Sequence, residues 1–261
     1  SIEANLLAVT CSWGDSLSKT LTETYGKEKG LHLYRRYHQA FMPAYQDKFK
    51  GKQAAKDIEN IEQTLETGEL SMSMYRPVEA KDNQFHFKVY HPSQLIPLSD
   101  VLPILEDMGL RVLNEIPHVI RPDLAGNKIV VIHDFGVETR KGSKVNLVQV
   151  RKNFQDSFSP TWGGEIESDG FNALVLFGGL GWREVMLLRA CCKYLRQAGI
   201  AFSQEYMEQT LVNNSHIACQ IVDLFKARFD PSIKCKSKVF HNRLEKELER
   251  VKSADEDRIL R

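Results

Sequence analysis

Long apolar runs and an excess of one charge sign are both missing from this sequence. The longest apolar stretch lies at Phe171 to Leu180, where two glycines interrupt it, and it is far shorter than the ~20 residues that span a bilayer. Lys plus Arg number 35 against 34 Asp plus Glu, for a net charge of +1, and the two signs are interspersed. We therefore expect neither a membrane segment nor the basic face that binds nucleic acid.

The cysteines also lack a pattern. Their number is odd, and the adjacent Cys191 and Cys192 would close only a strained ring if they were joined to each other. Neither has partners at the spacing of a zinc site. Free thiols in a reducing compartment fit this usage, so the expected location is the cytoplasm. The five positions are Cys11, Cys191, Cys192, Cys219 and Cys235.

Catalytic motifs are missing too. The sequence contains no P-loop, no G-x-S-x-G and no H-E-x-x-H. His133-Asp134, at the end of a predicted strand, could form half of an acid–base pair, but adjacent strand residues point to opposite faces of a sheet. A core histidine and a surface aspartate are the favoured interpretation. We therefore predict no catalytic, cofactor-binding or metal-binding residue in this chain.

A glycine-rich turn at Gly178 to Glu184 resembles a dinucleotide-binding fingerprint, because a strand-like apolar run precedes it and a helix-like one follows. The fingerprint needs a third small residue where helix and strand pack, and Glu184 occupies that position. Its carboxylate would crowd the packing and repel a phosphate, and no second strand ending in an acidic residue follows. The structural interpretation, in which the glycines permit close helix packing, is favoured over a nucleotide site.

What the sequence does contain is the composition of a folded globular protein, with 42% hydrophobic and 26% charged residues in a chain of 261. This length predicts two compact units. From Asn5 to Leu65 the apolar residues recur at helical spacing, which predicts three amphipathic helices. Four residues punctuate them where helices should stop or turn: Gly26, Gly30, Pro43 and Gly51.

Between Leu70 and Glu138 the helical period gives way to the alternation that is typical of strands. The predicted strands are Leu70–Tyr75, Phe85–His91, Arg111–Ile120 and Ile129–Phe135, with a turn at Lys81 to Asn83. The second strand shows the alternation most clearly, because apolar Phe85, Phe87 and Val89 alternate with His86, Lys88 and Tyr90. We therefore predict a sheet with one face on a core.

These elements follow the order of a split β-α-β unit of the ferredoxin-like kind. Ser99 can cap a helix from Asp100 to about Met108, and a second helical stretch runs from Val145 to Phe158. The usual fourth strand after this stretch is missing, whereas the strand at Leu70–Tyr75 precedes the unit. We predict a permuted antiparallel sheet in which this early strand pairs with Phe85–His91 and takes the missing place.

After Asp169 the pattern is helical again. Phe171 to Gln197 is apolar on most sides, which predicts a buried helix or helix pair. Two more helices are predicted within Phe202 to Phe229, and a charged one at Phe240 to Val251. The predicted fold class is α+β, with a helical segment at 1–66, a ferredoxin-like domain of one sheet and two helices at 67–160, and a helical domain at 161–261.

A set of long motifs spreads over nearly the whole chain. The motifs are Trp13 with Asp15 and Leu17; Tyr37-x-x-Ala40-Phe41-x-Pro43-x-Tyr45; Asp57-Ile58; Leu98 to Glu106 with Gly109-Leu110; Asp169-Gly170-Phe171-Asn172-x-Leu174-Val175; Leu180-x-Trp182-Arg183-Glu184; Leu188-Arg189-Ala190; Tyr194 to Gln197; and Phe229-Asp230-Pro231. Together they resemble the large-subunit NAD-specific glutamate dehydrogenases of bacteria.

This resemblance implies a multidomain enzyme that oxidatively deaminates L-glutamate to 2-oxoglutarate and ammonia with NAD. The long N-terminal region of that family holds ACT-like and helical modules, and this chain is similar to the last ACT-like module with its flanking helices. The implied partners are the catalytic domain of the same polypeptide and further copies in a homo-oligomer. The family's substrate-binding lysines and nucleotide-binding glycines lie downstream, so no catalytic residue is carried over to any position here.

The resemblance also raises the question of a regulatory ligand. ACT modules that bind amino acids usually have an Asp-x-x-Gly-type loop before the first helix, and Gln94 to Asp100 lacks the glycine. Ser99 and Asp100 are the candidate contacts for such a ligand. Three functional classes remain, in order of preference: a structural and assembly segment, an allosteric amino-acid sensor, and a self-contained enzyme.

Overall fold

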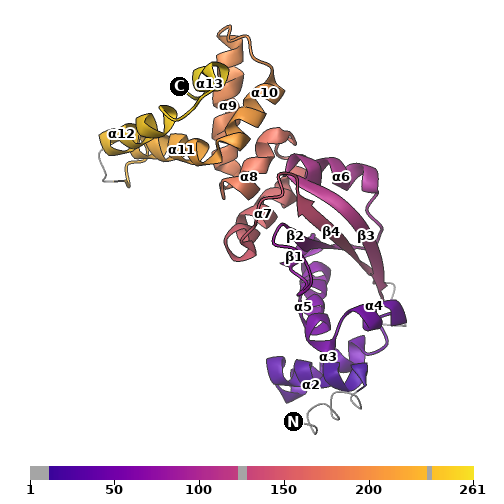
Figure 1. The fold of residues 1–261 in the computed structure, drawn as a ribbon. Coiled ribbons are helices and arrows are strands. Elements are labelled where there is room, and N and C mark those ends of the chain that lie inside the picture. The colour runs from indigo at the N-terminus through magenta and orange to yellow at the C-terminus, as the bar shows by residue number, and fades with distance from the viewer. Residues whose placement is uncertain (1–11, 123–127, 234–236) are drawn as a thin grey trace. The chain divides into compact units, whose positions relative to one another are not determined.

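A computed structural model describes residues 12–122, 128–233 and 237–261 (Figure 1). The described residues form two compact units, as the chain length predicts. The first unit takes the residues up to Arg76 together with His86–Pro97 and Leu113–Gly136, and the second takes Pro77–Phe85, Leu98–Val112 and Val137–Arg261. Each unit combines segments that are distant in the chain, and the division into three consecutive parts at 66 and 160 stays a prediction.

The described N-terminal part contains four helices rather than three. They are α2 (Trp13–Tyr25), α3 (Lys27–Tyr37), α4 (Pro43–Lys48) and α5 (Gly51–Thr67). The additional helix is the short α4, which begins at Pro43 because the fixed φ of proline suits the first helical position. Gly26 separates α2 from α3, and Gly51 begins α5, as expected.

The prediction that Gly30 ends or turns a helix is wrong, because this glycine is buried inside α3. A Cβ at Gly30 would stand 2.6 Å from the Cα atom of Thr22 in α2. A Cβ at Gly51 would likewise stand 2.5 Å from the backbone nitrogen of Leu17. Both glycines therefore allow a helix to approach the α2 backbone more closely than any side chain would permit.

Among the residues that the structure describes, four strands form one sheet in the order β1-β2-β4-β3. They are β1 (Ser71–Tyr75), β2 (Gln84–Pro92), β3 (Leu110–Ile120) and β4 (Val130–Thr139). The pairing of β1 with β2 is antiparallel and runs from Ser71 opposite Tyr90 to Tyr75 opposite His86. The predicted hairpin is confirmed, and so is the permuted order, because β1 lies at the edge beside β2 where a late fourth strand would otherwise pair. The α+β, ferredoxin-like fold class is therefore confirmed.

Two helices accompany the strands, α6 (Leu98–Asp107) and α7 (Leu147–Trp162). The prediction that Ser99 caps the first of them is wrong, because α6 already begins at Leu98 and Ser99 lies within its first turn. Asn146 caps α7, where its side chain accepts a hydrogen bond from the backbone of Val148 at 3.1 Å. An Asn at this position satisfies one of the free N–H groups of the first turn.

One apolar cluster holds the first unit together, and α5 lies beside β1 in it (Figure 1). It joins α2, α3, α4 and α5 to strand residues Tyr90, Ile120, Val130 and Ile132. Side chains on both sides of β2 are buried, since Lys88 and Tyr90 are as inaccessible as Phe87 and Val89. The prediction of a sheet with a single buried face is therefore wrong, because these helices cover the second face.

The second unit is helical after α7. Its remaining elements are η1 (Gly170–Asn172), α8 (Ala173–Phe177), α9 (Trp182–Gln197), α10 (Gln204–Asn213), α11 (Ser215–Phe229), α12 (Ser237–Leu248) and α13 (Ala254–Leu260), with α11 beside α12 (Figure 1). The predicted helix pair within Phe171 to Gln197 is confirmed. Its burial is not complete, however, because Met186 and Tyr194 of α9 are 46% and 69% exposed.

Candidate functional site

A buried carboxylate in the middle of α5 is the first candidate. Asp57 accepts hydrogen bonds from Lys88 Nζ at 2.5 Å, Tyr45 Oη at 2.5 Å and Tyr90 Oη at 2.7 Å. Because Tyr45 lies in α4 and the other two donors lie in β2, this carboxylate joins three elements. Burial, reinforced by the charge of Asp57, raises the pKa of both tyrosines, which therefore remain protonated donors.

The Lys88 ammonium is enclosed by aromatic rings as well as by this carboxylate. Lys88 is only 2% exposed, and its Nζ atom lies 3.8 Å from the ring centroid of Phe49 and 5.1 Å from that of Tyr75. The faces of such rings attract a cation. The alternation of β2 predicted an outward, polar position for Lys88. Its burial could not be predicted from the strand alone, because helices that are distant in the sequence cover that face of the sheet.

A second buried carboxylate, Asp134 of β4, lies in the same unit and is 0% exposed. It accepts hydrogen bonds from Lys48 Nζ at 2.6 Å, His86 Nδ1 at 2.8 Å and Tyr75 Oη at 3.1 Å. Although burial acts to raise its pKa, the hydrogen bonds and charges of His86 and Lys48 lower it to about 2. The prediction of a surface aspartate is therefore wrong, because its three donors make burial of an ionised carboxylate tolerable.

His133 is a core residue, as predicted, and points away from Asp134. Its Nε2 atom accepts a hydrogen bond from the backbone N–H of Ile96 at 3.1 Å, and its Nδ1 atom lies 2.8 Å from Glu115 Oε1. The nitrogen that accepts from a backbone N–H carries no proton, so the proton must be on Nδ1 and be donated to Glu115. Burial lowers the pKa of His133, while Glu115 acts in the opposite direction.

His118 of β3 belongs to the same buried region. Its ring stands edge-on to that of Tyr45, with centroids 5.2 Å apart and an interplanar angle of 90°. Among the described residues, none provides a hydrogen bond to its Nε2 atom. Burial lowers the pKa of His118, so this imidazole is neutral at pH 7.

The chemistry of this region is governed by the contacts that its charged groups already make. Each carboxylate oxygen of Asp57 and Asp134 accepts at least one side-chain hydrogen bond. A general base needs an atom that can take a proton from a substrate. The two carboxylates instead face Lys88 and Lys48, so the arrangement can hold α4 and α5 against the strands of the first unit.

The second unit has its own ion pair, between the partly buried Asp169 and the buried Arg189. Arg189 Nε lies 2.7 Å from Asp169 Oδ2, Nη2 lies 2.8 Å from Oδ1, and Nη2 also donates to Asn172. The pair joins the turn before α8 to α9. Sequence motifs contained both Asp169-Gly170-Phe171-Asn172 and Arg189, but nothing in either motif indicated that they pair with each other.

The glycine-rich turn is a helix-to-helix connection, because the apolar run before it forms α8 and not a strand. Glu184 Oε2 accepts a hydrogen bond from the Gly181 N–H at 2.6 Å, and its other oxygen pairs with Lys226. The carboxylate therefore occupies the N-terminus of α9, where a phosphate would have to bind. Gly178 permits a close approach, because a Cβ there would stand 3.3 Å from Cys219 Sγ.

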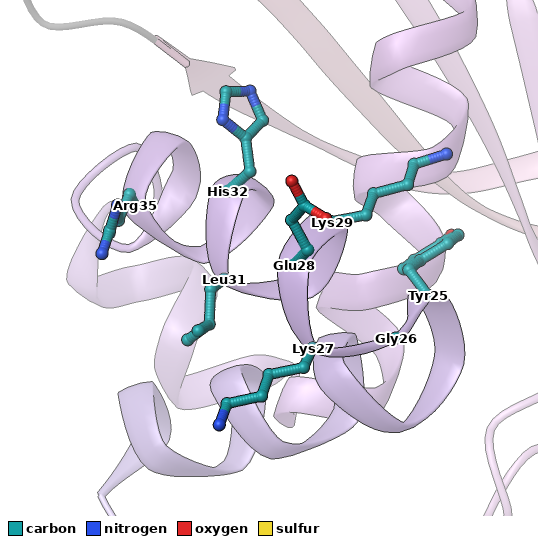
Figure 2. A pocket seen from close by; sticks show the side chains of 8 residues that line it. All are labelled: Tyr25, Gly26, Lys27, Glu28, Lys29, Leu31, His32 and Arg35. Atoms are coloured by element: carbon teal, nitrogen blue, oxygen red, sulfur yellow. The ribbon is translucent and has the colours of Figure 1, made fainter.

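Ser99 and Asp100, the candidate ligand contacts, are both exposed in the first turn of α6. The structure brings them together, since Ser99 Oγ donates to Asp100 Oδ1 at 3.0 Å. Elsewhere, a surface hollow of about 820 Å³ lies at the turn between α2 and α3 (Figure 2). Its charged side chains, including Lys27, Glu28 and Arg35, do not converge on one point in Figure 2, so the hollow lacks the geometry of a site.

Within residues 12–122, 128–233 and 237–261, no group of three His, Cys, Asp or Glu side chains is placed to hold a metal ion. The same residues include no helix that is long and apolar enough to cross a membrane. Cys191, Cys192 and Cys219 are free thiols, whereas Cys11 and Cys235 lie outside the described residues.

Comparison with known proteins connects these clusters to one family. Three family models match the chain: glutamate dehydrogenase helical motif 2 over residues 20–64, its ACT3 domain over 69–150, and its helical motif 3 over 166–231. The NAD-specific glutamate dehydrogenases of Halomonas elongata and Pseudomonas aeruginosa are each 34% identical over 100% of the chain. The chain belongs to this glutamate dehydrogenase family.

The match covers only a small part of these glutamate dehydrogenases. The chain spans 16% of the length of each of those two relatives. A third, the NAD-specific glutamate dehydrogenase of Mycobacterium tuberculosis, is 30% identical over 88% of the chain and is covered over 14% of its own length. The pair Asp57–Lys88 joins the segment that matches glutamate dehydrogenase helical motif 2 to the segment that matches the ACT3 domain. The pair Asp169–Arg189 lies within the segment that matches helical motif 3.

Proposed function

We propose that this chain is a non-catalytic structural and regulatory segment of an NAD-dependent glutamate dehydrogenase, the enzyme that converts L-glutamate, NAD and water to 2-oxoglutarate, ammonia and NADH. The catalytic groups and the NAD site then lie in other parts of the polypeptide. Its partners are the catalytic domain of the same chain and further copies in a cytoplasmic homo-oligomer, with no role for nucleic acid or membrane.

The buried Asp57–Lys88 pair carries this proposal, because it joins the ACT3 segment to the helical motif before it. A buried ion pair adds little net stability compared with apolar residues of the same volume, yet removing one partner costs about 3–5 kcal/mol. Such a pair favours one relative placement of its two elements over alternatives. Fixed placement of modules is what a structural segment of a long enzyme requires.

A direct test uses the purified 261-residue chain. We expect no NADH formation from glutamate and no heat on titration with NAD, because Glu184 occupies the helix N-terminus that a pyrophosphate would need. The Glu184→Gln variant serves as the comparison, since it removes the negative charge and keeps an oxygen for the Gly181 N–H. Turnover by the chain, or NAD binding that tightens in Glu184→Gln, would contradict the proposal.

An amino-acid-sensing role is the second candidate, and the exposed Ser99–Asp100 pair in the ACT3-matched segment favours it. Calorimetric titration of the chain with a panel of amino acids separates the two roles. A structural segment gives no saturable heat. A sensor gives binding that is lost in Asp100→Asn but kept in Asp255→Asn, a matched control in which an exposed aspartate is changed in the first turn of another helix.

A further inference from the structure

His133 connects the sheet of the first unit to the loop at residues 93–97, and both of its ring nitrogens are engaged. Nε2 accepts from the Ile96 N–H at 3.1 Å, and Nδ1 donates to Glu115 at 2.8 Å. His133 is 1% exposed and the Ile96 side chain 5%. The loop is therefore attached to the sheet by the buried side chain of Ile96 and by the hydrogen bond from the Ile96 N–H to His133.

The backbone of this loop is held in an unfavourable conformation. Ser93, at the start of the loop, has a φ of 76°, and it is the one residue other than glycine with positive φ among those the structure describes. Its N–H donates to the Ile129 carbonyl at 2.8 Å. Residues in this region of φ persist only when their surroundings enforce them. The bonds made by Ser93 and Ile96 are such enforcing contacts.

Only the neutral form of His133 can make both of its contacts. A proton added to Nε2 would point at the Ile96 N–H, so two donors would face each other and the backbone hydrogen bond would be lost. The contact with Glu115 would remain and become an ion pair. Protonation therefore acts selectively on the loop and leaves the link to β3 in place.

The groups that face His133 set the pH at which this happens. Glu115 of β3 favours the charged ring, whereas burial and His91 of β2 disfavour it. Asp134 is next in sequence but points to the other face, where it binds Lys48 and His86. Because the net effect lowers the pKa of His133, the change falls below the ordinary histidine value of about 6.5.

We propose that His133 is a proton-sensitive switch that holds the loop at residues 93–97 when neutral and releases it when protonated. The ligand of this switch is the proton, and its output is the order of the segment that leads along the chain into α6. The inference concerns this chain alone and does not depend on its role in glutamate oxidation.

Nitrogen-15 NMR of the histidine-labelled 261-residue chain, together with amide exchange of Ile96 between pH 5 and 8, tests the proposal. We expect His133 to carry its proton on Nδ1 at pH 8. As it titrates, the protection of the Ile96 amide, corrected for intrinsic exchange, should fall about tenfold, the equivalent of one hydrogen bond. A proton on Nε2 at pH 8, or constant Ile96 protection through the titration, would overturn the proposal.

Two variants and one control sharpen this test. His133→Gln keeps an oxygen that can accept from Ile96 but cannot titrate, so the acid-induced loss of protection should disappear. Glu115→Gln removes the carboxylate that favours imidazolium, so the midpoint should move to lower pH. His32→Gln removes an exposed histidine of α3 and should leave the response unchanged. If His133→Gln does not fold, the tautomer measured in the unmodified chain still decides the outcome.

Discussion

Each unit contains a carboxylate–cation pair with at least one buried partner, and the two units use such pairs in different ways. In the first, Asp57 and Lys88 are 31 residues apart, and Lys48 and Asp134 are 86 apart, so each pair joins helix and strand. In the second, Asp169 and Arg189 are only 20 residues apart and pair through two parallel hydrogen bonds. The first unit thus relies on a point charge within aromatic rings, and the second on the fixed geometry of a guanidinium group. The difference shows that buried charge can order distant segments or rigidify a local turn.

Removing the cation of the first unit should have the largest effect. In Lys88→Met, Asp57 keeps its two tyrosine donors but loses its counter-charge in a buried setting. We expect the free energy of unfolding to fall by about 3–5 kcal/mol, measured by urea denaturation. Lys152→Met is the control, because Lys152 forms an exposed pair with Asp156, and its cost should stay within about 0.5 kcal/mol. Equal effects of the two variants would show that burial of the pair is irrelevant.

A substitution that keeps the positive charge at Arg189 but changes its geometry tests whether the second unit depends on the shape of the guanidinium group. Arg189→Lys retains a cation beside Asp169 but cannot form the bidentate contact, so we expect a loss of about 1.5–3 kcal/mol in unfolding free energy. Arg196→Lys, on the exposed side of α9, is the matched control and should be nearly neutral. If Arg189→Lys were as harmless as the control, the second unit would depend on charge alone.

Packing at Gly30 offers a test of the first unit that involves no charge. The added methyl of Gly30→Ala would stand 2.6 Å from Thr22 Cα, a backbone atom that cannot move aside cheaply. Overpacking of this kind costs about 1–3 kcal/mol. Gly163→Ala, at the end of α7 with φ −71° and its nearest neighbour 3.6 Å away, should be tolerated. Thermal unfolding of the two variants measures the difference.

The smallest effect is a difference in pH dependence between the units. The folded pKa of His133 lies below its unfolded value, so the first unit loses stability as pH falls through about 6.5. Burial raises the folded pKa of Glu208 in α10 above its unfolded value. The second unit therefore gains stability as pH falls towards about 4.5, because Glu208 takes up its proton more readily in the folded state. The two slopes have opposite signs.

Tryptophan fluorescence can follow the units separately, because Trp13 lies in the first and the other two tryptophans lie in the second. Unfolding would be monitored in a variant that retains only Trp13 and in one that lacks it. Glu208→Gln should flatten the acid response of the second unit and leave that of the first unchanged. The same flattening in both units would contradict the assignment.

The strands were predictable because their signal is local. Alternation at Phe85, Phe87 and Val89 identified β2, and the early strand at Leu70–Tyr75 indicated the permuted order. The inward positions of Lys88 and Asp134 were not predictable, because their burial depends on helices that lie far away in the sequence. For the same reason the exposed residues of α9 were not predicted, since helical periodicity shows which side of a helix is apolar but not whether another element covers that side.

The order β1-β2-β4-β3 also has a consequence for the sequence of events during synthesis. The last strand of this sheet to be synthesised, β4, is an interior strand that lies between β2 and β3. Until residue 139 has emerged, the hairpin of β1 and β2 can form, but β3 has no neighbouring strand to pair with in its native place. A nascent chain whose emerged part ends before Val130 should therefore expose an unpaired β3 to chaperones, whereas one from which α7 has also emerged should not.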